Sequence, residues 1–429
     1  MSKWTHAPLS HCVESLDAGV SVNAEDRPHR AGEVGVLKTS ALSGYVFHPE
    51  QNKAVVRAER RLVAEPVLAN SILVSRMNTP ALVGESCYVA EAHETIFLPD
   101  RVWQVKLRAE VPTNMRWLSY VLQSHEYRHY VEVHATGTSG SMKNLPKSAL
   151  LSLPVRYPDE PEQTQIATVL SMIDSAIKQT EAIVEKLKKV KQGLLHDLLT
   201  RGVDVNGELR PSRIEAPDLY QASPMGWIPK AWSLGSVGTE FEIQLGKMLD
   251  AEKNLGVYKP YIGNRAVQWG GIDMGAAQLV KMTRSDLVRF RLTKGDLLVC
   301  EGGEVGRAAI WDEPVDECYY QKALHRLRPL RGYSPHLMLA FLRYWTGRDM
   351  LANYVSQTSI AHLTQEKLAS VPLPIPDGDE QAAVASRLIA LDTKARSEDQ
   401  TLAKLRATKN GLMDDLLTGR VRVTPLLAQ

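Results

Sequence analysis

Apolar residues recur at alternating steps of four and three in two long stretches of the chain, residues 158–202 and 376–420. This is heptad spacing, and each series would form a helix roughly 55 Å long. The series consists of Ile166, Leu170, Ile173, Ile177, Val184, Leu187, Leu194 and Leu198 in the first stretch and Val384, Leu388, Leu391, Leu402, Leu405, Leu412 and Leu416 in the second. One such stripe is typical of a helix on a core, but two matched stripes predict a pair of antiparallel, coiled-coil-like helices. Polar residues, Lys191 and Lys409 among them, interrupt both series.

The chain also repeats itself. When it is shifted by 218 residues, residues 141–205 align with residues 359–423 without a gap, and 23 of the 65 pairs are identical. A Pro-Asp-x-x-Glu-Gln motif precedes each predicted helix, at residues 158–163 and 376–381, and Asp-Leu-Leu-Thr closes each. A period this long indicates a duplicated half-protein with pseudo-twofold internal symmetry. Two similar halves in turn favour two similar ligands.

The segments outside the predicted helices have a different pattern. Residues 1–157 and 226–375 contain short apolar runs, such as residues 71–75 and 296–300, separated by Gly and Pro. These runs predict short mixed strands. An irregular connector is expected at 203–225 and a tail at 421–429. The expected fold class is therefore α+β, with two globular mixed α/β domains separated by the helices at 158–202 and 376–420.

Composition excludes several classes of protein. The chain has 429 residues, of which 44% are hydrophobic and 23% charged, so disorder and a disulfide-stapled miniprotein are excluded. The net charge of +2 makes no case for nucleic acid, and any basic patch must be local. The four cysteines show no metal-site spacing and are expected to be buried thiols. Without a signal sequence or an apolar span, the protein is predicted to be cytoplasmic, with no membrane contact.

The sequence lacks the common catalytic motifs. It contains no nucleotide-triphosphate loop of the Gly-x-x-x-x-Gly-Lys-Ser/Thr type, no dinucleotide fingerprint and no nucleophile elbow. The Gly-rich segment at residues 301–307 carries two acidic residues that would repel a phosphate, so a tight turn is the expected structure. We therefore predict no catalytic residue and no metal site. Two globular domains separated by a rigid spacer are typical of a protein that recognises a ligand.

The ordered set of motifs resembles the specificity subunit of a type I restriction–modification system. Both helix blocks, from Pro-Asp-x-x-Glu-Gln to Leu-Leu-Thr, are similar to the two central repeats of that family. Residues 226–232 are similar to the start of its target-recognition domains. Residues 75–79, 98–103, 295–303 and 321–329 resemble segments inside those domains. Each motif alone is weak, but the ordered set, present twice, is specific.

The resemblance implies that the chain catalyses nothing and uses no cofactor itself. Two target-recognition domains would each read one half of a bipartite, asymmetric site in double-stranded DNA. Two modification subunits would methylate adenine with S-adenosylmethionine, docked on or near the helices. Restriction subunits would supply translocation and cleavage with ATP and Mg. The helix pair would set the spacer between the half-sites.

Candidate DNA-contacting residues are basic or polar side chains in the two domains. They are Arg57, Arg60, Arg61, Arg76, Asn78, Thr79, Thr138, Ser139, Ser141, Lys143 and Asn144 in the first domain, and Lys247, Asn264, Arg265, Arg307, Lys322, His325, Ser356, Gln357 and Thr358 in the second. The alternative for each is a solvated face or a turn.

Other functions stay open on sequence alone. The chain could serve another methyltransferase or nuclease assembly that has a bipartite site, or it could be a coiled-coil scaffold with two protein-binding domains. An autonomous methyltransferase is disfavoured because the Asn/Asp-Pro-Pro-Tyr/Phe tetrapeptide is missing.

Overall fold

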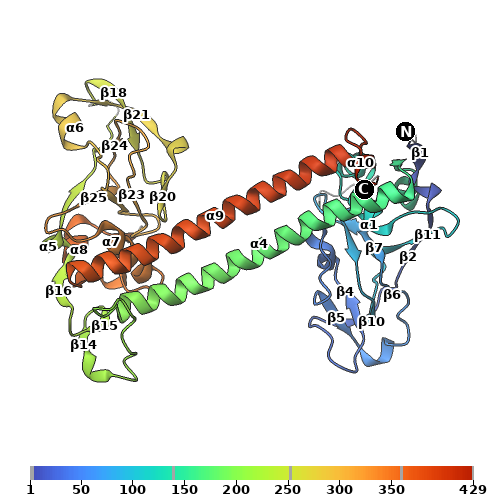
Figure 1. Ribbon diagram of the computed structural model, residues 1–429, viewed down its shortest axis with the longest axis horizontal. Coiled ribbons are helices and arrows are strands. Elements are labelled where there is room, and N and C mark those ends of the chain that lie inside the picture. Colours follow the sequence, from blue (N-terminus) through green and yellow to red (C-terminus); the bar gives the residue numbers. More distant parts are fainter. Residues whose placement is uncertain (1–3, 138–140, 251–253, 358–360, 428–429) are drawn as a thin grey trace. The chain divides into compact units, whose positions relative to one another are not determined.

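A computed structural model of the chain describes residues 4–137, 141–250, 254–357 and 361–427. The chain divides into two compact units (Figure 1). The first contains Met1–Glu181 together with Gln400–Gln429, and the second contains Ala182–Asp399. Each unit holds one mixed α/β domain and parts of two long helices, α4 (Glu160–Thr200) and α9 (Gly378–Leu416).

The domain of the first unit is built on two sheets. An antiparallel sheet has the order β2-β11-β7-β9, and a second sheet has the order β3-β5-β4-β10-β6. Their strands are β2 (Val13–Ala18), β11 (Val102–Leu107), β7 (Ser71–Ser75) and β9 (Ser86–Val89), then β3 (Ala24–Glu25), β5 (Asn52–Val55), β4 (Gly35–Leu37), β10 (His93–Phe97) and β6 (Pro66–Val67). Strand β7 is buried along its whole length, so the predicted apolar run at 71–75 forms the centre of this domain.

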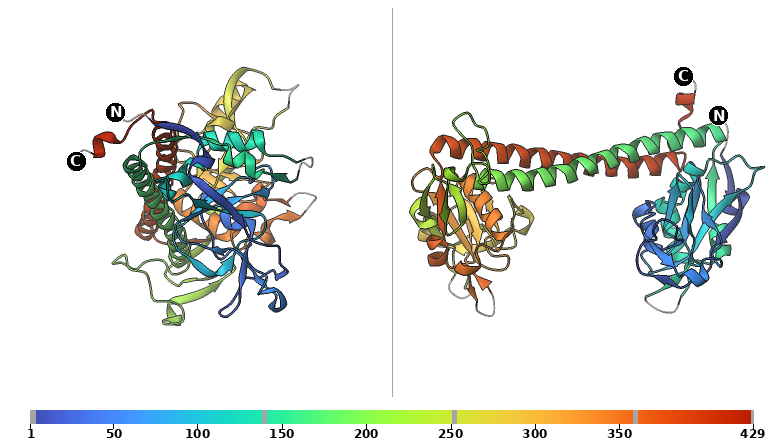
Figure 2. Two further views of the ribbon diagram at one scale, coloured as in Figure 1. Left: turned by 90° about the vertical axis from the view of Figure 1, so that its right-hand side faces the viewer. Right: turned by 90° about the horizontal axis from the view of Figure 1, so that it is seen from below.

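Short elements connect these sheets to the long helices. Helices α1 (Met115–Val121), α2 (His125–His134) and α3 (Lys147–Leu151) follow the first sheet. Strand β1 (Thr5–Pro8) pairs with β13 (Pro154–Tyr157), which leads into α4, and β8 (Met77–Asn78) pairs with β12 (Lys143–Asn144). The segment between α9 and α10 (Thr424–Leu427) reaches the residue before β1, since the Arg422 guanidinium lies 5.4 Å from the centre of the Trp4 ring, and Figure 2 shows both segments at the same end of α4.

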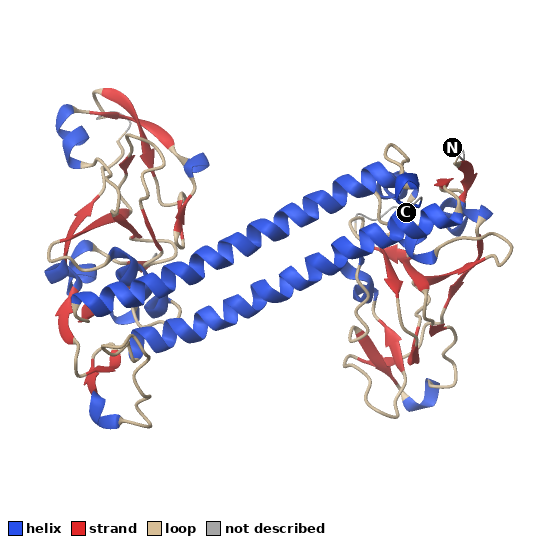
Figure 3. Ribbon diagram, viewed as in Figure 1, coloured by secondary structure: helices blue, strands red, loops and turns tan. Residues whose placement is uncertain are grey.

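The domain of the second unit repeats this plan. Its four-stranded sheet has the order β17-β25-β22-β23, which matches β2-β11-β7-β9 in chain order and antiparallel pairing. Its strands are β17 (Phe241–Leu245), β25 (Leu324–Pro329), β22 (Leu297–Cys300) and β23 (Ala308–Ile310). A smaller sheet, β21 (Gln278–Met282), β18 (Val257–Ile262) and β24 (Tyr319–Tyr320), takes the place of the second sheet. The predicted α+β class and internal repeat are confirmed (Figure 3).

The remaining elements of the second unit also have counterparts. Strands β16 (Ser233–Ser236) and β28 (Pro372–Ile375) pair as β1 and β13 do. The helices are α5 (Val237–Glu240), α6 (Arg284–Arg289), α7 (Pro335–Thr346) and α8 (Gln365–Ser370), and three short hairpins join β14 (Tyr220–Ser223) to β15 (Gly226–Pro229), β19 (Val267–Gln268) to β20 (Gly271–Ile272) and β26 (Ser356–Gln357) to β27 (Ala361–His362). The first of these hairpins starts inside the connector that was expected to be irregular.

Two long helices confirm the heptad prediction. Helix α4 runs over Glu160–Thr200 and α9 over Gly378–Leu416. Gly202 and Gly419, in the left-handed region at φ 64° and φ 74°, follow their ends, where a residue without a Cβ is favoured. The residues of the two apolar series fall into two classes by exposure. Buried are Ile166, Leu170, Val184, Leu198, Val384, Leu388, Leu402 and Leu416, and partly buried are Ile173, Ile177, Leu187, Leu194, Leu391, Leu405 and Leu412.

Candidate nucleic-acid interface and helix junctions

The repeated Pro-Asp-x-x-Glu-Gln motif joins each long helix to a domain. The Asp159 carboxylate accepts the backbone N–H of Glu162, at 3.1 Å, and so caps the first turn of α4. The Gln163 side chain accepts the backbone N–H of Asn114 at the start of α1, at 2.8 Å, and donates to the Pro158 carbonyl. The motif is therefore a connector between the helix and the domain.

The second copy of the motif makes the same contacts. Asp377 accepts the N–H of Glu380 at 2.8 Å. Gln381 accepts the N–H of Ser334, the N-cap residue of α7, at 2.9 Å, and donates to the Pro376 carbonyl. The identity of these residues in the two repeats thus has a local physical cause, because each side chain satisfies backbone groups that a helix end leaves unpaired.

The glutamate of each motif is buried and held by an arginine. Glu162 is 0% exposed and receives Nε and Nη2 of Arg422, at 2.7 and 2.6 Å, and the indole N–H of Trp4, at 2.9 Å. Glu380 receives two nitrogens of Arg210, at 2.5 and 2.8 Å. In both units the arginine comes from the segment that follows the other long helix. Each glutamate thus ties the start of one helix to the chain beyond the end of the other.

The two lysines that interrupt the apolar series pair with aspartates of the opposite helix. Lys409 of α9 lies 2.7 Å from Asp174 of α4, and Lys191 of α4 contacts Asp392 of α9. A further pair joins Arg406 to Glu181 at 2.7 Å. These two ion pairs of the first unit join Asp174 to Lys409 and the later Glu181 to the earlier Arg406. The two helix segments are therefore antiparallel, as predicted.

A small two-stranded sheet, formed by β8 and β12, gathers several of the candidate DNA contacts in the first domain. Strands β8 and β12 place Asn78 opposite Lys143, and the Arg76 Nε donates to the Asn144 side chain at 3.3 Å. The Arg76 guanidinium also lies 5.8 Å from the centre of the Trp103 ring. Thr79 is exposed just after β8 and Ser141 is exposed just before β12, whereas Thr138 and Ser139 fall outside the described residues. The structure therefore brings part of the predicted set together.

The three predicted phosphate contacts in the basic run, Arg57, Arg60 and Arg61, differ in their exposure. Arg57 and Arg61 are exposed. Arg60 is partly buried and donates to the carbonyls of Val55 and Gly32, both at 3.3 Å. Arg57 and Arg61 are thus the members of this run that can reach an external phosphate without breaking a contact in the protein.

A second group of candidates surrounds the Gly-rich turn of the second domain. Arg307 donates to the backbone carbonyl of Asn264, at 3.0 Å, and the Asn264 amide donates to the Gly302 carbonyl, at 2.9 Å. The expected tight turn is present, with Gly303 and Gly306 in the left-handed region. These bonds hold the turn beside the β26–β27 hairpin, through an isolated bridge from Gly302 to β27.

The other candidates of the second domain differ in their exposure. Lys247 is largely buried and pairs with Asp286 at 2.8 Å, while Arg265 and Lys322 are exposed. His325 is 0% exposed within β25, where Nε2 lies 2.8 Å from the Leu363 carbonyl, and burial lowers its pKa. It therefore does not lie at the protein surface. Ser356 and Gln357 form β26, and Thr358 falls outside the described residues.

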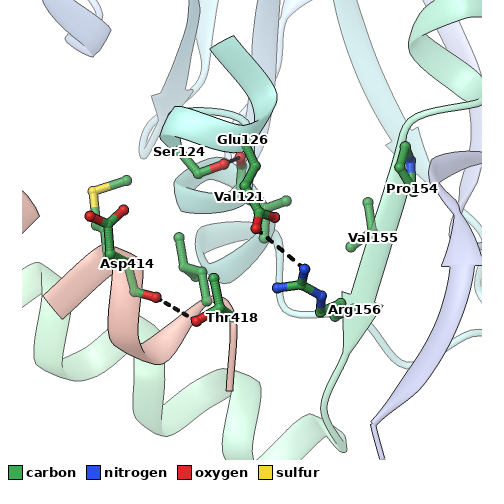
Figure 4. A pocket seen from close by; sticks show the side chains of 10 residues that line it. Val121, Ser124, Glu126, Pro154, Val155, Arg156, Asp414 and Thr418 are labelled. Atoms are coloured by element: carbon green, nitrogen blue, oxygen red, sulfur yellow. Dashed lines mark hydrogen bonds and ion pairs between the residues drawn. The ribbon is translucent and has the colours of Figure 1, made fainter. Parts of the chain in front are cut away.

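A small pocket lies in the first unit between α2, β13 and the end of α9 (Figure 4). Arg156 and Glu126 pair across it at 3.3 Å, and the Thr418 hydroxyl donates to the Asp414 carbonyl at 2.5 Å. Its volume of about 30 Å³ admits only a few water molecules. The pocket is therefore a small gap between packed elements and not a ligand site.

The described residues hold no group of three or more His, Cys, Asp or Glu side chains arranged for a metal ion. The four cysteines are free and buried, as predicted. Over the ranges that the structure describes, no helix is both long enough and apolar enough to cross a membrane.

Comparison with known proteins agrees with this fold. Residues 229–407 match the family model described as the type I restriction modification DNA specificity domain. The chain is 24% identical over 326 residues to the type I restriction enzyme MjaVIII specificity subunit of Methanocaldococcus jannaschii, covering 72% of this chain and 71% of that protein. It is 23% identical over 441 residues to the type I restriction enzyme EcoKI specificity subunit of Escherichia coli, covering 98% and 88% of the two proteins.

A solved structure extends this agreement to the fold. The S subunit of a type I restriction–modification system from M. genitalium superposes with a TM-score of 0.60 at 17% identity, covering 96% of each chain. The fold and the helix junctions define a class of duplicated proteins. In this class, each of two α+β domains is joined to a long helix through a Pro-Asp-x-x-Glu-Gln motif. Together with the sequence matches, this architecture supports the assignment of the chain as a type I restriction–modification specificity subunit, as its motifs indicated.

Proposed function

We propose that this chain is the DNA-reading subunit of a type I restriction–modification complex and that each α+β domain reads one half of a bipartite, asymmetric site. The observation that carries the proposal is the duplicated domain plan, together with the type I DNA specificity domain matched over residues 229–407. The two domains share the strand order of their four-stranded sheets but differ in the second sheet, which has five strands in the first domain and three in the second. Two different half-sites are the expected consequence.

The long helices act as the spacer of this reader. Each has about 40 residues, which corresponds to roughly 60 Å at 1.5 Å per residue, compared with about 34 Å for one turn of duplex DNA. The two domains then contact major grooves that are separated by a fixed number of base pairs, and neither domain contacts those intervening pairs. The spacer of the recognised site is set by helix length and not by base contacts.

The chemistry belongs to partner subunits. Two modification subunits dock on or near the helices, one for each repeat, because a duplicated surface presents two equivalent sites. They methylate adenine with S-adenosylmethionine, and restriction subunits supply ATP- and Mg-dependent translocation and cleavage. The complex works in the cytoplasm, where the DNA that it reads is located. This chain contributes recognition and geometry.

The test is single-molecule mapping of DNA methylation in a host that expresses the chain with its neighbouring modification subunit. The control host lacks only this chain. A split motif with methylated adenine in both halves, absent from the control, is the expected result. Identical maps, with expression of the partner verified, would overturn the proposal. Binding of the purified chain to duplex DNA should fall steeply with salt, whereas a protein-binding scaffold would show no such binding.

A further inference from the structure

Asp174 connects three elements of the first unit. Its carboxylate accepts the hydroxyl of Tyr120 at 2.6 Å and lies 3.1 Å from Arg116, both on α1 of the domain. The same carboxylate pairs with Lys409 of α9 at 2.7 Å. The buried apolar contacts between α4 and this domain extend to Leu170, one turn before Asp174. The carboxylate is therefore a polar brace just beyond the end of the apolar contact.

Asp392 occupies the same place in the second unit. It pairs with Lys191 of α4, and Arg343 of α7 lies 4.0 Å away. The Arg343 guanidinium also lies 5.8 Å from the centre of the Trp269 ring, which holds it at the domain surface. The apolar contact between α9 and this domain includes Leu388, one turn before Asp392. Domain, near helix and opposite helix again meet at one carboxylate.

The two arrangements are related by the internal repeat. Asp174 and Asp392 differ by the 218-residue period, and so do Lys191 and Lys409. All four side chains are partly buried, with exposures between 20% and 32%. An isolated ion pair on a helix surface contributes little, but a half-buried carboxylate with donors from two other elements restrains their relative position.

We propose that Asp174 and Asp392 are positioning residues that fix the angle of each recognition domain on the helices and so decide how strictly the spacer between the half-sites is read. The proposal rests on the proposed function. Arg116 and Arg343 couple each aspartate to its domain, and the lysines couple it to the opposite helix. Without the brace, the domain swings about the apolar contact at Leu170 or Leu388.

Domain motion can be measured without DNA. Spin labels at Leu62→Cys in the domain and Met172→Cys on α4 occupy exposed positions, while the native cysteines are buried. The distance distribution should be narrow in the full-length chain and wider in Asp174→Asn. Glu181→Gln is the matched control, because it removes an ion pair that joins α4 to Arg406 of α9. An unchanged width in Asp174→Asn would overturn the proposal.

Two single variants separate the parts of the brace. Arg116→Leu removes the charged contact from the domain, and Lys409→Met removes the contact from α9. Wider distributions are expected for both, with the larger effect for Arg116→Leu because it acts on the domain directly. If Lys409→Met widens the distribution and Arg116→Leu combined with Tyr120→Phe, which removes both domain contacts of the carboxylate, does not, Asp174 joins only the helices and the proposal is wrong.

Spacer selectivity is the second readout, measured by methylation mapping of the full complex. The double variant Asp174→Asn, Asp392→Asn should methylate sites with one extra or one missing spacer pair, with discrimination reduced about tenfold, while both half-site sequences stay the same. A uniform loss of methylation at an unchanged spacer would indicate a purely structural role and overturn the proposal. If the parent chain directs no split motif, the proposed function fails, whereas the spin-label result stands independently.

Discussion

Two nitrogens of Arg422 donate to the carboxylate of Glu162, which lies 260 residues earlier in the chain. Glu162 starts α4 and is fully buried, while Arg422 follows the end of α9. Arg210 and Glu380 repeat the arrangement in the second unit. The segment after α9 in the first unit therefore takes the structural role that the segment after α4 takes in the second.

Replacing Arg422 with Ala should destabilise the first unit. The buried Glu162 carboxylate would lose its charged partner, and breaking such a pair costs roughly 3–5 kcal/mol in the free energy of unfolding. Urea unfolding of parent and variant measures this cost. Arg420→Ala is the control, because Arg420 is 67% exposed and its partner Asp415 is 35% exposed, and a loss below about 1 kcal/mol is expected. Equal losses in the two variants would contradict the assigned role.

His325 should make stability depend on pH. Burial lowers its pKa in the folded state below the ordinary 6.5, so the unfolded chain binds the proton more readily. The stabilisation is present above the unfolded pKa and is lost as pH falls from 6.5 toward the folded pKa. The free energy of unfolding, compared between about pH 7.5 and about pH 5.5, should fall less in His325→Gln than in the parent chain. Equal slopes would show that other groups dominate acid destabilisation.

Arg76→Ala should relax recognition of one half-site. The Asn144 bond and the Trp103 ring hold the Arg76 guanidinium beside the two-stranded β8–β12 sheet, and loss of a base contact costs roughly 1–3 kcal/mol at that position. Binding to cognate and single-base-substituted duplexes measures the effect. Arg61→Ala, on the exposed basic run, should instead weaken binding to all sequences alike and reduce the salt slope by about one. If Arg76→Ala binds all of these duplexes with the affinity of the parent chain, Arg76 does not contact DNA.

Lengthening both helices should change the spacer and leave the half-sites unchanged. One heptad inserted after Glu181 and one after Asp399 would preserve the ion pairs Asp174–Lys409 and Lys191–Asp392, because each pair lies within one unit. Each helix grows by roughly 10 Å, about three base pairs of duplex. Methylation mapping reports the new spacer. An unchanged spacer would rule out the helices as its determinant.

The sequence predicted the architecture because its signals are periodic and local. The heptad spacing defined α4 and α9, and the 218-residue repeat implied that the two domains share one plan. Short apolar runs marked the buried strands β7 and β22. The hairpin β14–β15 was missed because irregular composition and a short two-stranded ribbon look alike in sequence.

The candidate interface was predicted less completely. Arg76, Asn78, Lys143 and Asn144 do gather at one small sheet, because β12 pairs with β8 and Arg76 bonds to Asn144. His325 has the same polarity but lies in a central strand with no exposure. Residue type alone cannot separate these cases, because exposure depends on which strands flank a residue.

What the sequence determined by itself is the duplication, the helix pair and the family resemblance, since each is written in spacing and order along the chain. Only the tertiary structure decided what the repeated polar residues do. Lys191 and Lys409 appear in sequence as breaks in an apolar series, yet each meets an aspartate of the opposite helix. Periodicity reports which face of a helix is apolar. It carries no information about which distant residue will lie against a polar position, because that depends on how the helices pack.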